Sequence, residues 1–303
     1  MHKTFLRIFL LALVLGLTAC SLSDDQSTPY GYVKSSIRII DKYALYADGD
    51  WSVERKTYLD EAKSIDNFDD AHELVRGALA FAGGKHSTLL APVTDTASYE
   101  EMAPEAYMLE DGIAYVKLPA HSGVKVSDDV YTHTVLDFLQ GHLDAAGVVI
   151  DLRDNRGGNM YPMISAVAPL LPDGILLKFQ TRKRTSPISL DFVVRSMGLN
   201  PVEMAKFPGD TPIAILTNDM TGSSGEATLL CFRGLENART FGAPTAGYAS
   251  SNQVFPMSDG YSLVLTIGRD VARTGEVFCD DPIDPDVTTA TPLEDALAWI
   301  LGR

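Results

Sequence analysis

The pattern of apolar and polar positions divides the chain into a helical first part and a longer part with a different pattern. Apolar residues recur at three- and four-residue spacing in "SSIRIIDKYALYADG" and in "DEAKSIDNFDDAHELVRGALAFAGG", which predicts helices. Gly83 and Gly84 end the second of them. We therefore expect a small helical N-terminal domain over 31–84, followed by loops over 85–111.

From residue 112 the chain alternates between short apolar runs and amphipathic segments. "GIAYVKLP", "GVVIDLRD", "GILLKFQTRK" and "PIAILTN" predict strands, and "RTFGA", "NQVFPM" and "YSLVLTIGRDV" predict further short strands. Helices are expected at "VSDDVYTHTVLDFLQGHLDAAG", "NMYPMISAVAPLL", "GSSGEATLLCFRGLENA" and "PLEDALAWILGR". Strands that alternate with helices in this way indicate an α/β fold with helices covering a sheet.

The first twenty residues have the composition of an export signal. Lys3 and Arg7 precede a short apolar run, and small residues lead to Cys20, which predicts a signal peptide over 1–19. An N-terminal core helix is the alternative. The ending "LTAC" resembles the bacterial lipoprotein box, which implies that Cys20 is the first mature residue and carries a lipid anchor. The polar residues 20–30 would be a flexible tether. We expect a cell-envelope lipoprotein in the bacterial periplasm or on the outer surface.

Composition narrows the classes of partner. The formal net charge is −15 and the chain has no basic run, which argues against nucleic acid as a partner. Two cysteines remain after Cys20, and in an oxidising compartment Cys231 and Cys279 are candidates for one disulfide. Two buried thiols are the alternative. The cysteines lack metal-ligand spacing, and no two histidines stand four apart in a predicted helix, so we expect no metal or cofactor.

Two stretches carry candidate chemistry. In "GVVIDLRDNRGG", Gly157 and Gly158 follow a buried strand, either as a plain turn or with N–H groups facing a developing oxyanion. In "TNDMTGSSGEATLLCFRG", Ser223 and Ser224 stand where a helix begins, and Glu226 completes the spacing of a capping box. A serine after a buried strand and a small turn can also be an exposed nucleophile. Local reasoning alone leaves both alternatives open for each stretch.

A family resemblance favours the chemical alternatives. "DLRDNRGG" is similar to the Asp-Leu-Arg-x-Asn-x-Gly-Gly motif of the tail-specific, or C-terminal processing, serine peptidases. "SSGEA" followed by "FGAPTAGYAS" resembles their nucleophile helix and downstream turn, and "GIAYVKLP" and "TGEVFCDDPIDPDV" resemble their opening strand and closing segment. The resemblance implies a catalytic domain over 85–303 with an α/β sandwich of ββα units, related to the ClpP and crotonase folds. It also implies a peptide or protein substrate.

The resemblance assigns the nucleophile and the oxyanion hole. The family's nucleophile stands three positions before the helix glutamate, which selects Ser223 rather than Ser224. The N–H groups of Ser224 and Gly157 would then bind the oxyanion, with Gly158 the less favoured donor. The implied reaction is serine attack on a peptide carbonyl, followed by hydrolysis of an acyl-enzyme.

The general base departs from the commonest pattern of the family. Many relatives use a lysine 25 residues after the nucleophile, and here that position is Tyr248. "GGKHSTLL" instead resembles the histidine-using branch that includes the tricorn core protease, which implies His86 as the base, with His121 in reserve.

The residues that would orient the base match the pattern of this branch less well. Candidates are Ser87, Glu276, Asp280 and Tyr248, whereas Cys279 stands where that branch has an orienting glutamate. These departures leave a catalytically weak or inactive peptide- or ligand-binding protein on the same fold as the alternative function. Only 25 residues separate His86 from Gly112, which is too few for the PDZ domain that many relatives carry.

Overall fold

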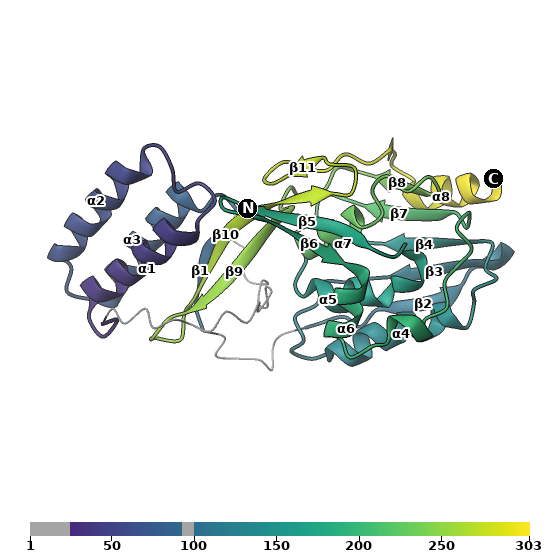
Figure 1. The fold of residues 1–303 in the computed structure, drawn as a ribbon, viewed down its shortest axis with the longest axis horizontal. Coiled ribbons are helices and arrows are strands. Elements are labelled where there is room, and N and C mark those ends of the chain that lie inside the picture. The colour runs from purple at the N-terminus through teal and green to yellow at the C-terminus, as the bar shows by residue number, and fades with distance from the viewer. Residues whose placement is uncertain (1–24, 93–99) are drawn as a thin grey trace.

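The computed structural model describes residues 25–92 and 100–303. Two six-stranded sheets and eight α-helices form the described part (Figure 1). The predicted signal peptide, the lipidation site Cys20 and the first residues of the predicted tether lie outside the described residues. Within the described ranges, no helix is long and apolar enough to span a membrane.

Helices and strands are numbered in chain order, with the labels used in Figure 1. The helices are α1 (Pro29–Tyr43), α2 (Trp51–Glu61), α3 (Phe68–Ala82), α4 (Asp128–Gln140), α5 (Met160–Ala166), α6 (Leu190–Ser196), α7 (Ser224–Leu230) and α8 (Pro292–Leu301). The strands are β1 (Thr88–Leu90), β2 (Glu105–Met108), β3 (Ile113–Lys117), β4 (Gly147–Asp151), β5 (Ile175–Thr181), β6 (Thr185–Ser189), β7 (Ile213–Thr217), β8 (Ala238–Gly242), β9 (Ser250–Pro256), β10 (Ser262–Ala272), β11 (Val277–Phe278) and β12 (Val287–Thr288).

One sheet has the order β12-β8-β7-β4-β3-β2 and is parallel except for the pair of β2 and β3. Its strands alternate between two cores, because successive side chains of a strand point to opposite faces. Val148 and Ile150 join the core that contains α4, α5 and α7. Val149 and Leu216 join a second core with Ile300 of α8. Both faces are covered, which explains why β4 and β7 read as continuous apolar runs.

The other sheet is built around β10, the longest strand of the described part. It pairs antiparallel with β1, β5, β9 and β11, and β6 extends the sheet beyond β5. Leu263 and Leu265 of β10 pack with α1 and α3 in one core, together with Leu89 of β1. The three N-terminal helices therefore lie against one face of this sheet and share its core (Figure 1).

The predicted fold class is correct, and the elements differ from expectation at a few places. Residues 85–111 contain strands β1 and β2 rather than loops alone. Strand β6 and helix α6 were not predicted, and the helix expected over 222–238 ends at Leu230. The chain then turns through Gly234, which has a positive φ of 82° that glycine adopts readily.

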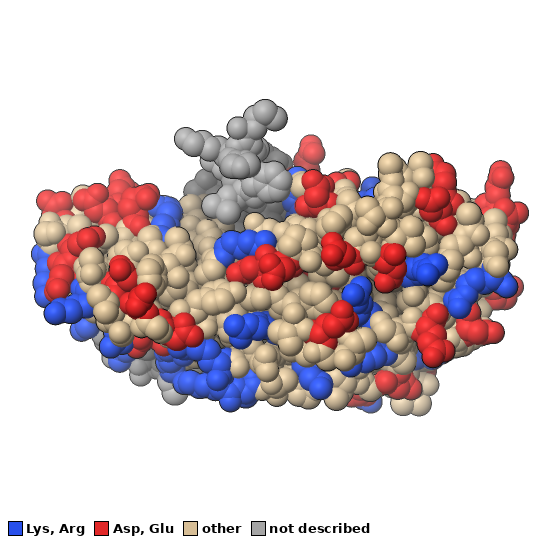
Figure 2. Space-filling model, turned by 90° about the horizontal axis from the view of Figure 1, so that it is seen from above, with Lys and Arg blue, Asp and Glu red and all other residues tan. Residues whose placement is uncertain are grey.

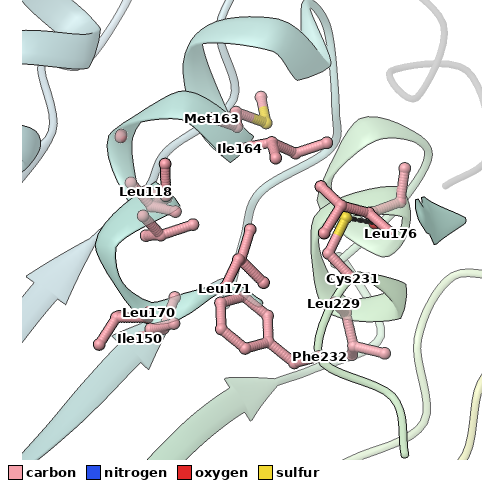
Figure 3. Close-up of a cluster of buried hydrophobic side chains, with 14 of the residues drawn as sticks. Leu118, Ile150, Met163, Ile164, Leu170, Leu171, Leu176, Leu229, Cys231 and Phe232 are labelled. Carbon is pink, nitrogen blue, oxygen red and sulfur yellow. Dashed lines mark hydrogen bonds between the residues drawn. The ribbon is translucent and has the colours of Figure 1, made fainter. Parts of the chain in front are cut away.

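The predicted disulfide is wrong, because both cysteines are free thiols. Cys231 lies fully buried at the end of α7, packed among Leu176, Leu229 and Phe232, and its thiol donates to the carbonyl of Ala227 at 3.3 Å (Figure 3). Cys279 instead contacts the hydroxyl of Tyr46 at 2.9 Å, next to the N-terminal helices. The two sulfur atoms thus belong to different packing environments.

Charged side chains are mixed on the face seen in Figure 2. Acidic and basic residues are interspersed there over both the helical end and the sheet-containing end of the protein. Surface ion pairs of the protein include Arg55–Asp41 and Arg195–Asp191. The negative charge of the chain is therefore not gathered into one patch on this face.

Candidate active site

Two neighbouring parallel strands deliver the loops of the candidate site. Strands β4 and β7 pair in register, with Asp151 opposite Leu216, so the loops that follow them leave the same edge of the sheet. The two loops are joined by hydrogen bonds: the Gly222 N–H donates to the carbonyl of Asn155 and the Thr221 hydroxyl to the carbonyl of Leu152, both at 2.8 Å. The Gly157–Gly158 turn is thereby held against the start of α7.

Ser223 adopts an unusual backbone conformation between β7 and α7. Its φ is +54° and its ψ is −118°, a combination that residues with a side chain rarely adopt and that stores about 1–3 kcal/mol of strain. The Ser223 side chain makes no cap hydrogen bond to the helix. Instead its hydroxyl group lies in a cavity that is also lined by His86, Gly158, Ser224 and Tyr248. Ser223 therefore does not serve as an ordinary N-cap.

The carboxyl group of Glu226 stabilises the backbone conformation of Ser223. The side chain is fully buried and accepts the N–H of Ser223 at 2.8 Å, as the capping-box spacing predicts. It also accepts the hydroxyl of Thr245 and the N–H groups of Gly247 and Tyr248. Burial raises the pKa of Glu226, while these four hydrogen bonds oppose the rise. One carboxyl group thus fixes the start of α7 to the turn before β9.

The two glycines of the turn beside the cavity differ in their contacts. The Gly157 N–H donates to Asn155 Oδ1 at 2.9 Å, so it is engaged within its own loop. A Cβ on Gly157 would lie 2.7 Å from the Cβ of Ser223, which explains why only glycine fits there. Gly158 does line the cavity. The carbonyl of Gly158 accepts the hydroxyl of Ser224 at 2.6 Å, which fixes the Ser224 side chain.

His86 enters the cavity from the segment that follows α3. Its Nδ1 lies 2.8 Å from Ser250 Oγ at the start of β9, and its carbonyl accepts Asn252 Nδ2 at 3.3 Å. The ring meets the Tyr248 ring edge to face, with the centroids 5.1 Å apart. These contacts fix the ring plane, so that Nδ1 faces the protein and Nε2 is the nitrogen that can act as a base.

The surroundings keep His86 neutral. Burial, together with the neighbouring charge of Lys85, lowers the pKa of His86 to about 3. Lys85 itself lies with its ammonium 4.6 Å from the centre of the Tyr248 ring and donates to the carbonyl of Ala246 at 3.3 Å. Tyr248, at the position where many relatives carry a lysine, thus supports a lysine and a histidine from another segment.

The remaining predicted residues are engaged elsewhere. The Ser87 hydroxyl donates to the carbonyl of Gly83 and accepts the N–H of Thr266. Glu276 pairs with Arg233 on the surface, and Asp280 accepts the hydroxyl of Tyr46 at 2.8 Å. His121 is buried beside Asp128, with Nε2 2.7 Å from its carboxylate. None of these four predicted residues lines the cavity of Ser223.

Sequence reasoning missed two residues that organise the site. Ser250 contacts His86 across 164 positions of the chain, and no local pattern marks it. Asn155 is fully buried; its carbonyl joins the two loops by accepting the N–H of Gly222, and its side-chain amide donates to the carbonyl of Leu118. Its place in "DLRDNRGG" was the available signal. Among the described residues, no cluster of three or more His, Cys, Asp or Glu side chains is arranged to hold a metal ion.

Comparison with known proteins places this site in a family. A family model described as peptidase family S41 matches residues 112–289, which is more than half of the chain. The chain belongs to peptidase family S41. This S41 chain is a serine-type peptidase, a hydrolase, and the predicted relationship to C-terminal processing peptidases is confirmed.

Two curated relatives illustrate the range of the family. The nisin-resistance protein of Lactococcus lactis subsp. lactis is 30% identical over 285 residues, which cover 91% of this chain and 88% of that protein. The carboxy-terminal-processing protease of Bartonella bacilliformis is 23% identical over 195 residues, which cover 62% of this chain and only 41% of that protein. The S41 chain thus matches the first relative over nearly its full length.

Solved structures agree with this placement. A lipoprotein from Streptococcus agalactiae has a TM-score of 0.83 at 29% identity, with 98% of this chain and 100% of that chain covered. The photosystem II D1 C-terminal processing protease has a TM-score of 0.66 at 14% identity, with 91% and 97% covered, and shares the fold. The predicted α/β fold of the S41 peptidase is therefore confirmed.

Proposed function

We propose that this chain is an exported, lipid-anchored serine peptidase in which Ser223 is the nucleophile and His86 the general base. The observation that carries the proposal is the backbone of Ser223, held at φ +54° between a buried strand and a helix. Strain of this kind persists where the surrounding structure maintains it, and it presents a nucleophilic hydroxyl in other serine hydrolases. The cavity shared with His86 supplies the base.

The proposed reaction proceeds through an acyl-enzyme. His86 Nε2 takes the proton of Ser223 Oγ while this oxygen attacks the peptide carbonyl carbon. The same nitrogen returns the proton to the leaving amine when the C–N bond breaks. A water molecule then attacks the ester, again with His86 as base, and frees the second product. For this cycle Nδ1 must keep its proton and donate it to Ser250 Oγ, which is 2.8 Å away.

The oxyanion hole is proposed to combine the N–H groups of Ser224 and Gly158. Both residues line the cavity beside Ser223. The N–H of Gly157, which the family resemblance favoured, already donates to Asn155 Oδ1. Gly158 therefore replaces Gly157 in the proposal, since an oxyanion donor must point at the position where charge develops.

Covalent labelling tests the nucleophile. The mature protein is treated with a fluorophosphonate probe and compared with the variants Ser223→Ala and Ser224→Ala. Labelling is expected in the wild type and in Ser224→Ala, which keeps its backbone N–H, and is expected to be lost in Ser223→Ala. Mass spectrometry of the labelled peptide locates the modified residue. Absent labelling of folded wild type, or labelling that survives in Ser223→Ala, would contradict the proposal.

Substrate and location are proposed from the relatives and from the N-terminus. The relative named nisin-resistance protein makes nisin the first peptide to test as a substrate. The structure described as a lipoprotein, together with the "LTAC" sequence, supports lipidation of Cys20. Replacement of Cys20 by Ala is then expected to move the protein from the membrane fraction to the soluble fraction. Retention in the membrane fraction would argue against the anchor.

A further inference from the structure

Strand β10 presents an acidic residue to the cavity of Ser223. Leu263 and Leu265 pack against the N-terminal helices, whereas Val264 and, beyond a register shift between Thr266 and Gly268, Asp270 line the cavity. Asp270 is only 2% exposed and pairs across the sheet with Phe179 of β5. The cavity therefore reaches from the surface at Ser223 to a carboxyl group in the interior.

Asp270 has no counter-charge in the described part of the chain. Its Oδ1 is buried without a hydrogen-bond partner, and no described Lys, Arg or His forms an ion pair with it. Burial raises the pKa of Asp270 well above its usual range, and the neighbouring Glu226 raises it further. A buried carboxyl without partners is unfavourable for folding, so its place on the wall of a ligand cavity calls for a ligand that satisfies it.

Two other buried polar atoms of the cavity-lining residues also lack partners. Ser251 Oγ and Asn252 Oδ1 are both without a hydrogen bond, and both residues line the cavity. Ser251 Oγ lies 2.6 Å from where a Cβ of Gly268 would be, and Gly268 is two positions before Asp270 on the same face of β10. The unsatisfied atoms are thus two acceptors and one hydroxyl group, which together favour a ligand that donates several hydrogen bonds.

The cavity also has apolar walls. Its walls include the following side chains: Leu90, Met160, Phe179, Val254 and Val264. Lys85 and Arg156 are cations of the same cavity; Lys85 is held over the Tyr248 ring, and Arg156 has interactions of its own. A cavity with apolar walls and a buried carboxyl group suits a side chain with an aliphatic stem and a cationic head.

We propose that Asp270 is a specificity-determining residue, whose subsite accepts a Lys or Arg side chain of the peptide substrate. The aliphatic stem packs between the apolar walls, and the cationic head donates to Asp270, with Ser251 and Asn252 as further partners. On binding, the carboxyl group of Asp270 releases its proton to solvent and forms an ion pair with the substrate. The assignment of a peptide as the ligand rests on the proposed function, in which Ser223 attacks a peptide bond.

Peptide cleavage provides the first test. A proteome digested at acidic residues, which keeps Lys and Arg inside the peptides, is incubated with the mature protein, and new termini are sequenced by mass spectrometry. Lys and Arg are expected to be enriched at one position near the cleaved bond. In a matched fluorogenic pair, the substrate with Lys there should have a kcat/KM at least about 10-fold above the one with norleucine. Asp270→Asn should abolish this preference, while Asp144→Asn, an exposed control outside the cavity, should retain it.

Ligand binding provides a second test that needs no catalysis. The Ser223→Ala variant is titrated with butylguanidinium and with butylurea, a neutral molecule of nearly the same shape, and the melting temperature is recorded. Butylguanidinium is expected to raise the melting temperature and butylurea is not. The double variant Ser223→Ala, Asp270→Asn should lose the response. It should still fold, because it removes an unpaired buried acid.

The two tests separate failure of the subsite from failure of the catalytic proposal. Equal effects of butylguanidinium and butylurea, or a response that survives in Asp270→Asn, would overturn the subsite whether or not the protein cleaves peptides. Cleavage without enrichment of Lys or Arg would overturn it as well. Loss of fluorophosphonate labelling together with an Asp270-dependent response to butylguanidinium would instead overturn only the catalytic role of Ser223.

Discussion

Ser223 and Ser224 show how adjacent residues of one type can differ in role. The hydroxyl of Ser224 is used to hold the glycine turn, through its bond to the carbonyl of Gly158. Ser223 has a positive φ, and its N–H rather than its side chain satisfies the capping partner Glu226. The conformation of the backbone, which the sequence does not display, separates a structural serine from a candidate nucleophile.

The low pKa of His86 predicts an unusual pH dependence. A histidine with the ordinary pKa of 6.5 would keep only about 3% of its neutral form at pH 5 and would lose activity accordingly. Because burial lowers the pKa of His86 to about 3, the neutral base should persist, and kcat/KM should not fall with a midpoint near 6.5. A pH–rate profile from pH 8 to pH 5 checks this, and an acid limb near 6.5 would contradict it.

The lowered pKa of His86 also makes the stability of the protein depend on pH, which affects the measurement of the pH–rate profile. The folded-state pKa of His86 lies below the unfolded value, so the unfolded chain binds a proton that the folded chain excludes. This contribution to stability is present above about pH 6.5 and is lost progressively as the pH falls. Each rate should therefore be measured at a temperature at which circular dichroism shows that the protein is folded.

Ser250 is expected to act as a positioning residue for His86. Replacement by Ala removes the hydroxyl group that accepts the Nδ1 proton in the proposed cycle, so the ring should lose its orientation and its tautomer preference. We expect kcat to fall by about 10- to 100-fold with little change in KM. Ser250→Thr keeps a hydroxyl group and should recover much of the rate. Equal losses in both variants, or an unchanged kcat in Ser250→Ala, would argue against this role.

Helix α7 depends on a turn that is distant in sequence. Glu226, in its first turn, accepts the hydroxyl of Thr245 and the N–H groups of Gly247 and Tyr248 as well as that of Ser223. The helix start, the nucleophile and the segment that leads to β9 are therefore one hydrogen-bonded unit. Helix α7 has only seven residues and would not be stable alone, so these hydrogen bonds stabilise it.

Glu226→Gln is expected to destabilise the protein. An amide has one acceptor oxygen, so its NH₂ group would face N–H donors that now bond to a carboxyl oxygen. Leaving buried donors without partners should lower the free energy of unfolding by about 3 kcal/mol. Urea denaturation measures the change, with Glu276→Gln as a surface control expected within about 0.5 kcal/mol of the wild type. Similar stabilities for the two variants would contradict the proposed contribution of Glu226 to stability.

Some elements were predictable and others were not. The strands β4 and β7 are buried on both faces, so their apolar runs identified them without further context. The three residues of β1 form a strand only because β10 offers its edge, a partner more than 170 positions away. The contact between Ser250 and His86 also spans a long distance in sequence, 164 positions, so no local pattern indicated it. Asp270 in "TIGRDV" looks like an ordinary polar position of a strand. Local patterns could not place either beside Ser223.

The N-terminal helices and the sheet around β10 form a common core, which predicts that the protein unfolds as one cooperative unit. Trp51 of α2 is buried in that core with Leu79, Leu263 and Leu265. Trp299 of α8 packs at the opposite end against Phe241, with the ring centroids 5.7 Å apart. Without the helices, the apolar face of β10 would be exposed to water, which would disfavour a catalytic region folded alone.

The two tryptophans allow this cooperativity to be measured, because the chain contains only two. In Trp299→Phe the fluorescence reports on the helical end, and in Trp51→Phe it reports on the end that holds α8. If the shared core couples the ends, urea should unfold both with one transition, and the circular dichroism of each variant should follow its own fluorescence. Fluorescence and circular dichroism midpoints that separate within either variant would mean that the helical end unfolds independently. Comparison within a variant removes the effect of each substitution on stability, so coincidence there is direct evidence for one unit.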